Sequence, residues 1–245
     1  MGHRMAAGRS VAAAAGDATR AAPAAAPAVQ LWSGGKDSAM ALWTARQTGE
    51  PDVQALATTV AGRIDRSTWH GVRTELMRRQ AAAVGLPLHE VRLADPYTLD
   101  QLMGAIEGFL RSDEAAPYAA VVWGDLFWDE ARRRHEGASV GAGKTGVYPL
   151  WGRETAELAR AVIGAGFRAI VTSVDLSRLD ASFAGRAYDA AFLAALPEGI
   201  DPCAEAGEFH TFVWDGPVFR EPVPVRRVRV ARRGETAYCD LAPAD

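Results

Sequence analysis

The fold is decided by residues 29–42, which read VQLWSGGKDSAMAL. Residues 29–32 form a short apolar run that predicts a buried strand, and residues 37–47 carry the pattern of a helix that ends before Gly49 and Pro51. The glycines between these two elements allow a sharp turn and a close approach of the backbone to a ligand. Because the start of a helix presents unpaired N–H groups and the positive end of the helix dipole, this strand–loop–helix unit predicts an anion site.

The side chains of the loop, Ser33-Gly34-Gly35-Lys36-Asp37-Ser38, fit a phosphate ligand. Lys36 can neutralise phosphate charge, and Ser33 and Ser38 can donate hydrogen bonds through their hydroxyls. Asp37 would repel phosphate unless a cation lies between them, so Mg²⁺ is expected at this residue. The alternative is an ordinary glycine-rich turn in which Ser38 caps the helix. The order of strand, loop and helix favours phosphate binding.

Outward from this loop, short apolar runs alternate with helix-length segments, which predicts an α/β fold with a parallel sheet and helices on both faces. Further strands are expected at residues 53–60, 88–91, 119–123 and 169–174, and helices at residues 73–84, 97–111 and 154–163. Beyond these the pattern changes to a helix at residues 186–196 and strands at 211–214 and 225–231. The last of these alternates valine and arginine, as an exposed strand does.

The change of pattern predicts three segments along the chain. Residues 29–150 are the expected ligand-binding α/β domain, with its boundary near Leu150. Residues 151–245 are expected to form a smaller α+β domain that packs against the first and closes the substrate site. Residues 1–28 are dominated by alanine and proline, and are either an organelle-targeting peptide or a disordered extension. The scarcity of serine favours the extension.

Charge and cysteine content narrow the classes of function. The formal net charge of −3 argues against binding nucleic acid through an extended basic face. The two cysteines, Cys203 and Cys239, form neither a disulfide framework nor a zinc pattern, so a reducing compartment, the cytoplasm, is expected. No apolar run approaches the roughly 20 residues of a membrane helix, so no membrane association is expected.

A second glycine-rich segment, residues 138–145 with the sequence ASVGAGKT, nearly matches a Walker A loop. A Walker A loop follows a buried strand and opens a helix. Here the preceding residues 129–136 are charged and predict a helix, and Pro149 prevents a helix from following. We therefore expect residues 138–145 to form a flexible surface loop without a nucleotide.

Two segments farther along the chain are candidates for the rest of the site. Gly124 and Asp125 follow a predicted strand at its carboxyl end, where ligands of open α/β sheets bind. Asp125 could bind metal, ribose or a substrate amine, or it could cap the next helix. Residues 201–211, DPCAEAGEFHT, are dense in titratable groups, which is typical of a site. Within them Cys203 could also be a buried apolar residue, and His210 a structural histidine.

The Ser33–Ser38 loop resembles the pyrophosphate loop of the ATP pyrophosphatase superfamily (PP-loop, adenine nucleotide alpha hydrolases), whose members release AMP and pyrophosphate. With further motifs, nearly all of the chain after Val29 resembles the diphthine–ammonia ligase family. The further motifs are Gly124-Asp125, Pro149-Leu150-Trp151, residues 201–211 and Asp215-Gly216-Pro217. The resemblance implies a Rossmann-like (HUP-type) ATP-binding domain and a smaller α+β substrate domain. It also implies ATP and Mg²⁺, a carboxylate substrate and ammonia or an amine as nitrogen donor, and leaves open a protein substrate and a homo-oligomer.

The resemblance also assigns roles to residues. It implies nucleotide binding by Ser33, Gly34, Gly35, Lys36, Asp37, Ser38, Gly124 and Asp125, with Asp37 also holding Mg²⁺. The residues expected to take part in catalysis are Lys36, Asp37, Glu205, Glu208 and His210. The last three are candidates for binding ammonium or for taking its proton.

The chain departs from the family in its second motif, which usually reads Cys-Gly-Glu-Asn-Gly-Glu and here carries Ala204 and Ala206. Its alanine- and arginine-rich composition is typical of a high-GC bacterial protein, and bacteria lack diphthamide. We therefore expect an AMP-forming amide ligase whose acceptor stays open. One alternative is a PP-loop enzyme that acts on a small molecule or on tRNA. Another is a nucleotide-binding module without turnover. A thiolase would require a cysteine spacing that Cys203 and Cys239 do not show.

Overall fold

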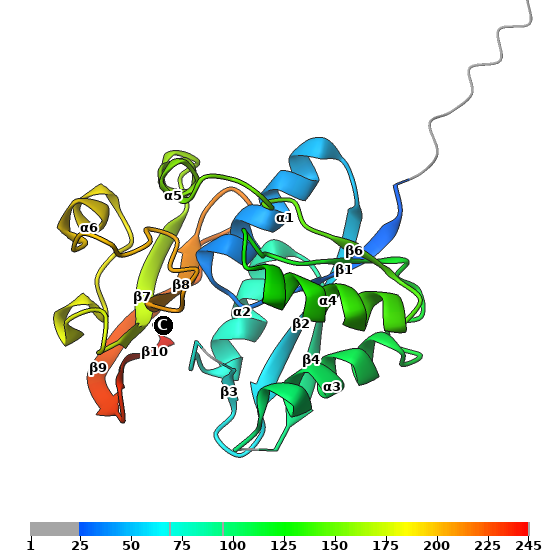
Figure 1. Ribbon diagram of the computed structural model, residues 1–245, viewed down its shortest axis with the longest axis horizontal. Helices are drawn as coiled ribbons and strands as arrows, with labels where there is room; N and C mark the ends of the chain where they lie inside the picture. Colours follow the sequence, from blue (N-terminus) through cyan, green and yellow to red (C-terminus); the bar gives the residue numbers. More distant parts are fainter. Residues whose placement is uncertain (1–24, 69, 95, 245) are drawn as a thin grey trace, which may run out of the picture.

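The computed structural model describes residues 25–68, 70–94 and 96–244. Two sheets lie side by side in it, each accompanied by its own helices (Figure 1). The segment predicted over residues 1–28 lies, apart from residues 25–28, outside the described residues. Within the described part of the chain, no helix is both long and apolar enough to cross a membrane.

The first sheet has the strand order β3-β2-β1-β5-β6, with β4 also paired to β2. Its strands are β1 (Pro27–Leu31), β2 (Asp52–Ala61), β3 (Arg66–Ser67), β4 (Leu88–Leu93), β5 (Ala120–Val122) and β6 (Thr145–Val147). The pairings of β1 with β2 and β5, of β2 with β4, and of β5 with β6 are parallel, which confirms the predicted α/β class. The short strands β3 and β6 were not predicted, because two or three residues carry no readable pattern.

Helices cover both faces of this sheet, as the sequence predicts. They are α1 (Lys36–Thr48), α2 (Thr74–Val84), α3 (Leu99–Leu110) and α4 (Asp129–Gly141). Helices α1 and α2 lie toward the second sheet, whereas α3 and α4 cover the other face (Figure 1). The buried side chains form two corresponding groups: Leu42 and Leu76 belong to one, and Leu102 and Ile106 to the other.

The second sheet is antiparallel, with the strand order β8-β7-β10-β9. Its strands are β7 (Arg168–Asp175), β8 (Phe209–Asp215), β9 (Val225–Arg233) and β10 (Thr236–Pro243). The strand predicted at residues 169–174 as a continuation of the parallel pattern therefore belongs to this second sheet. β9 lies at its edge and is exposed, as the alternation of valine and arginine predicts.

The helices of the C-terminal part are short. α5 (Thr155–Gly164) precedes β7, and a 3₁₀ turn, η1 (Ala181–Phe183), and α6 (Ala190–Ala195) follow it. The prediction of a helix over residues 186–196 is wrong for its first half, because Ala187 is bridged to Ile170 of β7 and the helix begins only after Asp189, whose carboxylate accepts the Phe192 N–H. The predicted boundary at Leu150 falls between β6 and α5 and stays a prediction.

The two parts meet where α1 and α2 face β8 and β10. Asp240 of β10 forms ion pairs with Arg66 (2.8 Å) and Arg73 (2.7 Å) of the first part. From β8, Val213 N–H donates a hydrogen bond to Gly34 O (2.9 Å). The glycine-rich loop therefore lies at the junction between the two sheets.

The expectation of a flexible surface loop at residues 138–145 is wrong. α4 continues to Gly141, and Ser139 within it is fully buried, accepting a hydrogen bond from Trp123 Nε1 (3.1 Å). Lys144 is also buried, and its ammonium donates to the main-chain carbonyls of Ala115 (2.7 Å) and Tyr118 (2.6 Å). Thr145 then opens β6. The segment is a helix end followed by a strand, which is the reverse of a Walker A unit.

Candidate functional site

The loop between β1 and α1 has a backbone that only glycine fits at its first turn. Gly34 has φ of +77°, and a Cβ there would lie 2.6 Å from Oε1 of Gln80. The Gly34 carbonyl accepts hydrogen bonds from Gln80 Nε2 (3.0 Å) and from the amide of Val213 (2.9 Å). α2 and β8 therefore both fix the loop in place.

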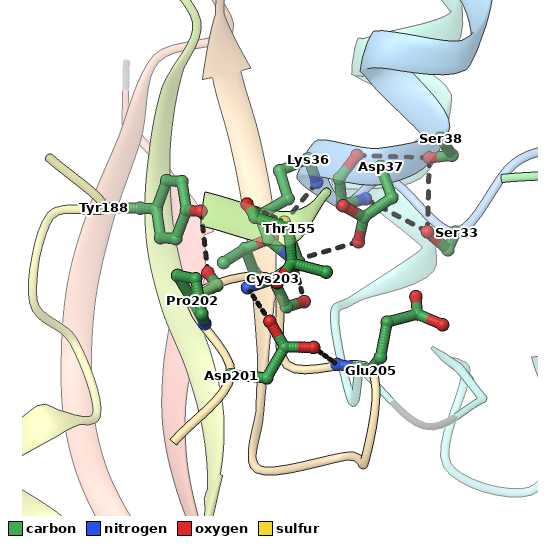
Figure 2. Close-up of polar contacts among 12 residues, drawn as sticks. Ser33, Lys36, Asp37, Ser38, Thr155, Tyr188, Asp201, Pro202, Cys203 and Glu205 are labelled. Carbon is green, nitrogen blue, oxygen red and sulfur yellow. Dashed lines mark hydrogen bonds and ion pairs between the residues drawn. The ribbon is translucent and has the colours of Figure 1, made fainter. Parts of the chain in front are cut away.

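The hydroxyl groups of the two loop serines form a hydrogen bond with each other. Ser33 Oγ and Ser38 Oγ are 3.2 Å apart, the Gly35 amide donates to Ser33 Oγ (3.2 Å), and Ser38 Oγ donates to Gly35 O (3.1 Å) (Figure 2). The N-cap of α1 is Gly35, which has no side chain that could cap the helix. Ser38 is therefore not the helix cap that the alternative interpretation required.

Lys36 and Asp37 form a buried ion pair at the start of α1. Lys36 Nζ lies 2.9 Å from Asp37 Oδ2 and donates a second hydrogen bond to the carbonyl of Cys203 (2.5 Å) (Figure 2). Burial opposes the charged form of Lys36, but the acidic groups around it, Asp37 first, together outweigh burial and raise the pKa of Lys36, so the ammonium stays charged. The other carboxylate oxygen, Asp37 Oδ1, is buried and has no hydrogen-bond partner in the described part of the chain.

The second motif reaches this ion pair from the C-terminal part. Asp201 fixes its turn, because its carboxylate accepts the amide N–H groups of Cys203 (2.9 Å) and Glu205 (3.2 Å). The Glu205 side chain extends toward the side of Ser33 and Asp37 (Figure 2). Burial, and next the charge of Asp37, raises the pKa of Glu205 to about 7. Glu205 can therefore exchange a proton near neutral pH.

The thiol of Cys203 has a structural environment. It is buried and donates to the carbonyl of Thr155 at 3.2 Å. Burial raises its pKa to about 12, so the reactive thiolate is not formed near neutral pH. Cys239 is also a buried free cysteine. This supports the interpretation of Cys203 as a packing residue and argues against sulfur transfer.

Gly124 and Asp125 lie beside the loop but differ in their contacts. A Cβ at Gly124 would lie 3.2 Å from the amide nitrogen of Ser38, so β5 ends directly against the start of α1. Asp125 Oδ2 accepts a hydrogen bond from His135 Nδ1 (2.6 Å), and the His135 ring stacks on Trp123 at 3.9 Å. Asp125 does not cap α4, whose N-cap is Trp128. His135 was not predicted, because nothing in its local sequence marks the pairing.

Glu208 directly precedes β8, and His210 is the second residue of that strand. The His210 ring lies 4.5 Å from the ring of His70, whose Nδ1 donates to the carbonyl of Thr211 (2.9 Å). Burial lowers the pKa of His70 to about 4 and that of His210 well below its usual value, so both imidazoles are neutral. Glu208 is buried, and one of its oxygens lies 3.3 Å from Arg178.

The structure therefore brings most of the predicted residues to one junction. Thr211 joins the two sides, because its Oγ1 accepts the Lys36 amide N–H (3.1 Å) while its carbonyl binds His70. His70 was missed from the sequence, since it stands alone in a loop and meets Thr211 only through the tertiary fold. A Cβ at Gly35 would lie 2.7 Å from His70 Cε1, so this histidine lies against the loop. Among the described residues, the side chains of Glu208, Asp125 and His210 contact Arg178, His135 and His70 rather than the loop itself.

Comparison with protein families identifies the chain. Residues 26–142 match the diphthamide synthase N-terminal domain, and residues 154–244 match the diphthamide synthase C-terminal domain. The chain belongs to the diphthamide synthase family, which comprises ATP-binding ligases of the PP-loop type. Membership implies an ATP-dependent activity like that of diphthine–ammonia ligase, with ammonia as a substrate.

A solved structure with a similar outline is a predicted subunit of tRNA methyltransferase from Methanocaldococcus jannaschii. It is 16% identical, the match covers 77% of this chain and 96% of that one, and the TM-score is 0.45. No functional argument rests on this likeness. A search of curated protein sequences found no match.

Proposed function

We propose that the chain is a ligase that forms AMP and pyrophosphate, adenylates a carboxylate and transfers the acyl group to ammonia or an amine. The observation that carries this proposal is the buried Lys36–Asp37 pair at the start of α1, with the unpartnered oxygen Asp37 Oδ1 beside it. A charged donor and a free anionic oxygen at a helix start suit a metal-bound polyphosphate.

The loop residues would hold the pyrophosphate part of ATP. Lys36 contributes charge, and Ser33 and Ser38 contribute hydroxyls that in this structure bond to each other. Asp37 Oδ1 fits Mg²⁺, because it is a buried carboxylate oxygen without a protein partner and hard cations prefer such ligands. When bound, Mg²⁺ would offset the negative charge that develops as pyrophosphate leaves.

Nucleotide binding would couple to the second motif through Lys36. Its ammonium donates to Cys203 O, and its amide to Thr211 Oγ1, so both contacts come from the C-terminal part. A phosphate that takes Lys36 as its partner competes with the Cys203 carbonyl. We therefore expect residues 201–205 to change position when ATP binds.

The second half of the reaction requires proton acceptors. A carboxylate oxygen of the substrate attacks the α phosphorus and pyrophosphate leaves. The ammonia nitrogen then attacks the carbonyl carbon, and AMP leaves with the electron pair of the carbon–oxygen bond. Ammonium has four protons and the amide keeps two, so two protons must be accepted. Glu205, with its pKa of about 7, is the candidate beside the loop. Burial holds the pKa of His210 well below its usual value, so this imidazole is a poorer proton acceptor near neutral pH.

The acceptor is proposed to be a carboxylate other than diphthine. Ala204 and Ala206 replace the usual glycine and asparagine of the second motif. Ala204 keeps the left-handed backbone of a glycine (φ of +59°), so the turn persists although the amide of the usual asparagine is gone. Complementation of a cell that lacks its diphthine ligase tests this choice: rescue by the unmodified chain would show that diphthine is accepted.

The product ratio tests the reaction itself. The full chain is incubated with ATP, Mg²⁺, ammonium and a panel of carboxylates, and AMP, pyrophosphate and ADP are measured. We expect equal amounts of AMP and pyrophosphate with one class of carboxylate, and loss of both in Asp37→Asn at every Mg²⁺ concentration. Release of ADP and phosphate instead, or unchanged turnover in Asp37→Asn, would contradict the proposal.

A further inference from the structure

Among the residues that the structure describes, three buried polar atoms in and beside the second sheet have no hydrogen-bond partner. They are Oγ1 of Thr172, Oγ of Ser173 and Oε2 of Glu208, and each of these residues is only 1% exposed. An unpaired buried polar atom costs about 1–3 kcal/mol, so three of them in one sheet call for a partner from outside the described chain, a water or a ligand. The unpaired Asp37 Oδ1 has a proposed partner, Mg²⁺ at the phosphate loop, whereas no partner has yet been proposed for these three atoms.

The sheet brings these atoms toward one another. Ser173 pairs with His210 across β7 and β8, and Thr172 is the extra residue of a β-bulge at this position. In such a bulge two residues of one strand face one residue of its neighbour. Glu208 lies at a bend two residues before His210, and its carbonyl accepts the amide N–H of Asp175 (2.9 Å), so its backbone still pairs with the end of β7.

A loop of the first part packs against this region of the sheet. Ser173 also pairs with Tyr238 of β10, and the Tyr238 ring would lie 3.2 Å from a Cβ at Gly71. The adjacent His70 lies over His210 with 4.5 Å between ring centres. The loop that carries His70 and Gly71 therefore packs on Tyr238 and His210, the two residues paired with Ser173, next to Gly35 of the phosphate loop.

The chemistry of the lining defines its ligand. Both hydroxyls, the carboxylate oxygen and a neutral imidazole can all accept a hydrogen bond, so the ligand must offer several N–H or O–H groups. Arg178 contacts Oε1 of Glu208 and is itself 44% exposed, and Oε2 has no partner among the described residues, so Oε2 is left free to accept a hydrogen bond from a cation. A metal ion is a poor fit, because no group of three or more metal-ligating side chains occurs among the described residues.

We propose that Thr172, Ser173 and Glu208 form the ammonium-binding site of the enzyme, next to His70 and Tyr238. This rests on the proposed ligase function and gives it a place for the nitrogen donor. Ammonium has one positive charge and four N–H donors, which match one carboxylate oxygen and its neighbouring acceptors. The site adjoins β8 and reaches the phosphate loop through His70 and Gly35.

Binding of ammonium itself tests the site without the unknown acceptor. The full chain is titrated with ¹⁵N-labelled ammonium chloride at constant ionic strength, and broadening of the ammonium resonance is followed. We expect saturable broadening in the native chain. Ser173→Ala and Thr172→Val should each weaken affinity about fivefold to tenfold, the cost of one lost hydrogen bond, and Glu208→Gln should weaken it further. Ser177→Ala is the matched control, because its hydroxyl is exposed and already donates to Asp175.

The stability of the same variants separates a ligand site from a packing role. Ser173→Ala and Thr172→Val remove hydroxyls that have no partner, so the unfolding temperature without ammonium should stay the same or rise while affinity falls. If one variant does not fold, the other gives the same reading. No saturable binding in the native chain, unchanged affinity in both variants, or equal competition by potassium, which donates no hydrogen bonds, would each overturn the proposal.

The ammonium-binding experiment and the ligase assay can fail independently of each other. Ammonium binding without any AMP formation would leave the site standing and remove the ligase function. Ammonium-dependent AMP formation without saturable ammonium binding, or with equal turnover at low ammonium in Ser173→Ala, would leave the ligase function and remove this site.

Discussion

The chain contains only two lysines, Lys36 and Lys144, and both follow a glycine-rich sequence. Both are buried, yet their partners differ. Lys144 donates to two main-chain carbonyls near it in the sequence, Ala115 and Tyr118, and no carboxylate is found beside it in the described chain. Lys36 contacts the carboxylate of Asp37 and the carbonyl of Cys203, which is 167 positions away in the sequence. A buried lysine is therefore a candidate for ligand binding only when a ligand can replace one of its hydrogen-bond acceptors.

The largest effect is expected from the substitution of Lys36, whose hydrogen-bond acceptors a ligand can replace. Lys36→Ala removes a charge-assisted contact to phosphate worth about 1.5–3 kcal/mol, so ATP affinity should fall roughly 10- to 150-fold. Pyrophosphate release should fall with it. Equilibrium ATP binding and product assays measure both, with the unfolding temperature as a check that the variant is folded. Native ATP affinity in Lys36→Ala would remove the loop from the nucleotide site.

Replacing the other lysine should give the opposite pair of results. Lys144→Ala leaves the carbonyls of Ala115 and Tyr118 without their donor, which costs about 1–3 kcal/mol. A loss of 2 kcal/mol lowers the unfolding temperature by roughly 4–8 °C in a chain of this size. ATP affinity, measured below that temperature, should stay within about twofold of the native value. A loss of ATP binding as large as that of Lys36→Ala would show that the two lysines do not differ in function.

The same comparison shows what could be predicted from the sequence. The strand, the loop and α1 were predicted because their signals are local: an apolar run, two glycines and a helix pattern within 20 residues. Residues 138–145 have similar glycines, and the prediction of an exposed loop was wrong because burial of Lys144 depends on carbonyls from residues 115 and 118. Glycine content indicates a turn but not its burial.

Contacts between the two parts could not be predicted in this way. His70 binds Thr211 across 141 positions, and Asp240 binds Arg66 across 174. The bulge at Thr172 also depends on the register between β7 and β8, which a single strand does not encode. The sequence therefore identified the residues of the second motif, while the face on which each would lie came only from the structure.

A smaller effect concerns the acid beside Lys36. The pKa of Glu205 is about 7 in the folded chain against its usual 4.5, so the folded state favours the protonated form. This contribution to stability is fully present below about pH 4.5 and is lost as the pH rises through 7. Glu205→Gln should therefore raise the unfolding temperature relative to the native chain more at pH 8 than at pH 5, in the absence of Mg²⁺ and ATP.

The control for this pH effect is Glu198→Gln, since Glu198 is exposed. It should change the unfolding temperature equally at the two pH values. If the difference between Glu205→Gln and the native chain were the same at pH 5 and pH 8, Glu205 would titrate normally. Lys36 would then have no neighbour that exchanges a proton near neutral pH. Asp37 would be the one acidic group that distinguishes the surroundings of Lys36 from those of Lys144.

The smallest expected effect concerns the backbone next to the main-chain carbonyls that accept hydrogen bonds from the two lysines. The Cys203 carbonyl bound by Lys36 directly precedes Ala204, which has φ of +59°, whereas the residues after Ala115 and Tyr118 have ordinary backbone angles. A left-handed conformation costs an alanine about 1–2 kcal/mol, and glycine avoids this at an entropic cost of about 0.5–1 kcal/mol. Ala204→Gly should therefore stabilise the chain by about 0.5 kcal/mol and raise the unfolding temperature by roughly 1–2 °C.

The neighbouring alanine supplies the matched control for this last change. Ala206 does not have a positive φ, so Ala206→Gly gains no relief from strain and should lower the unfolding temperature slightly. Scanning calorimetry of both variants in one buffer resolves the sign. Stabilisation by Ala204→Gly with destabilisation by Ala206→Gly would show that the turn at Cys203 is held under strain, which favours its release when a phosphate takes Lys36. Destabilisation by both variants would mean that the Cys203 carbonyl lies in a relaxed turn, as fixed a partner for Lys36 as Ala115 and Tyr118 are for Lys144.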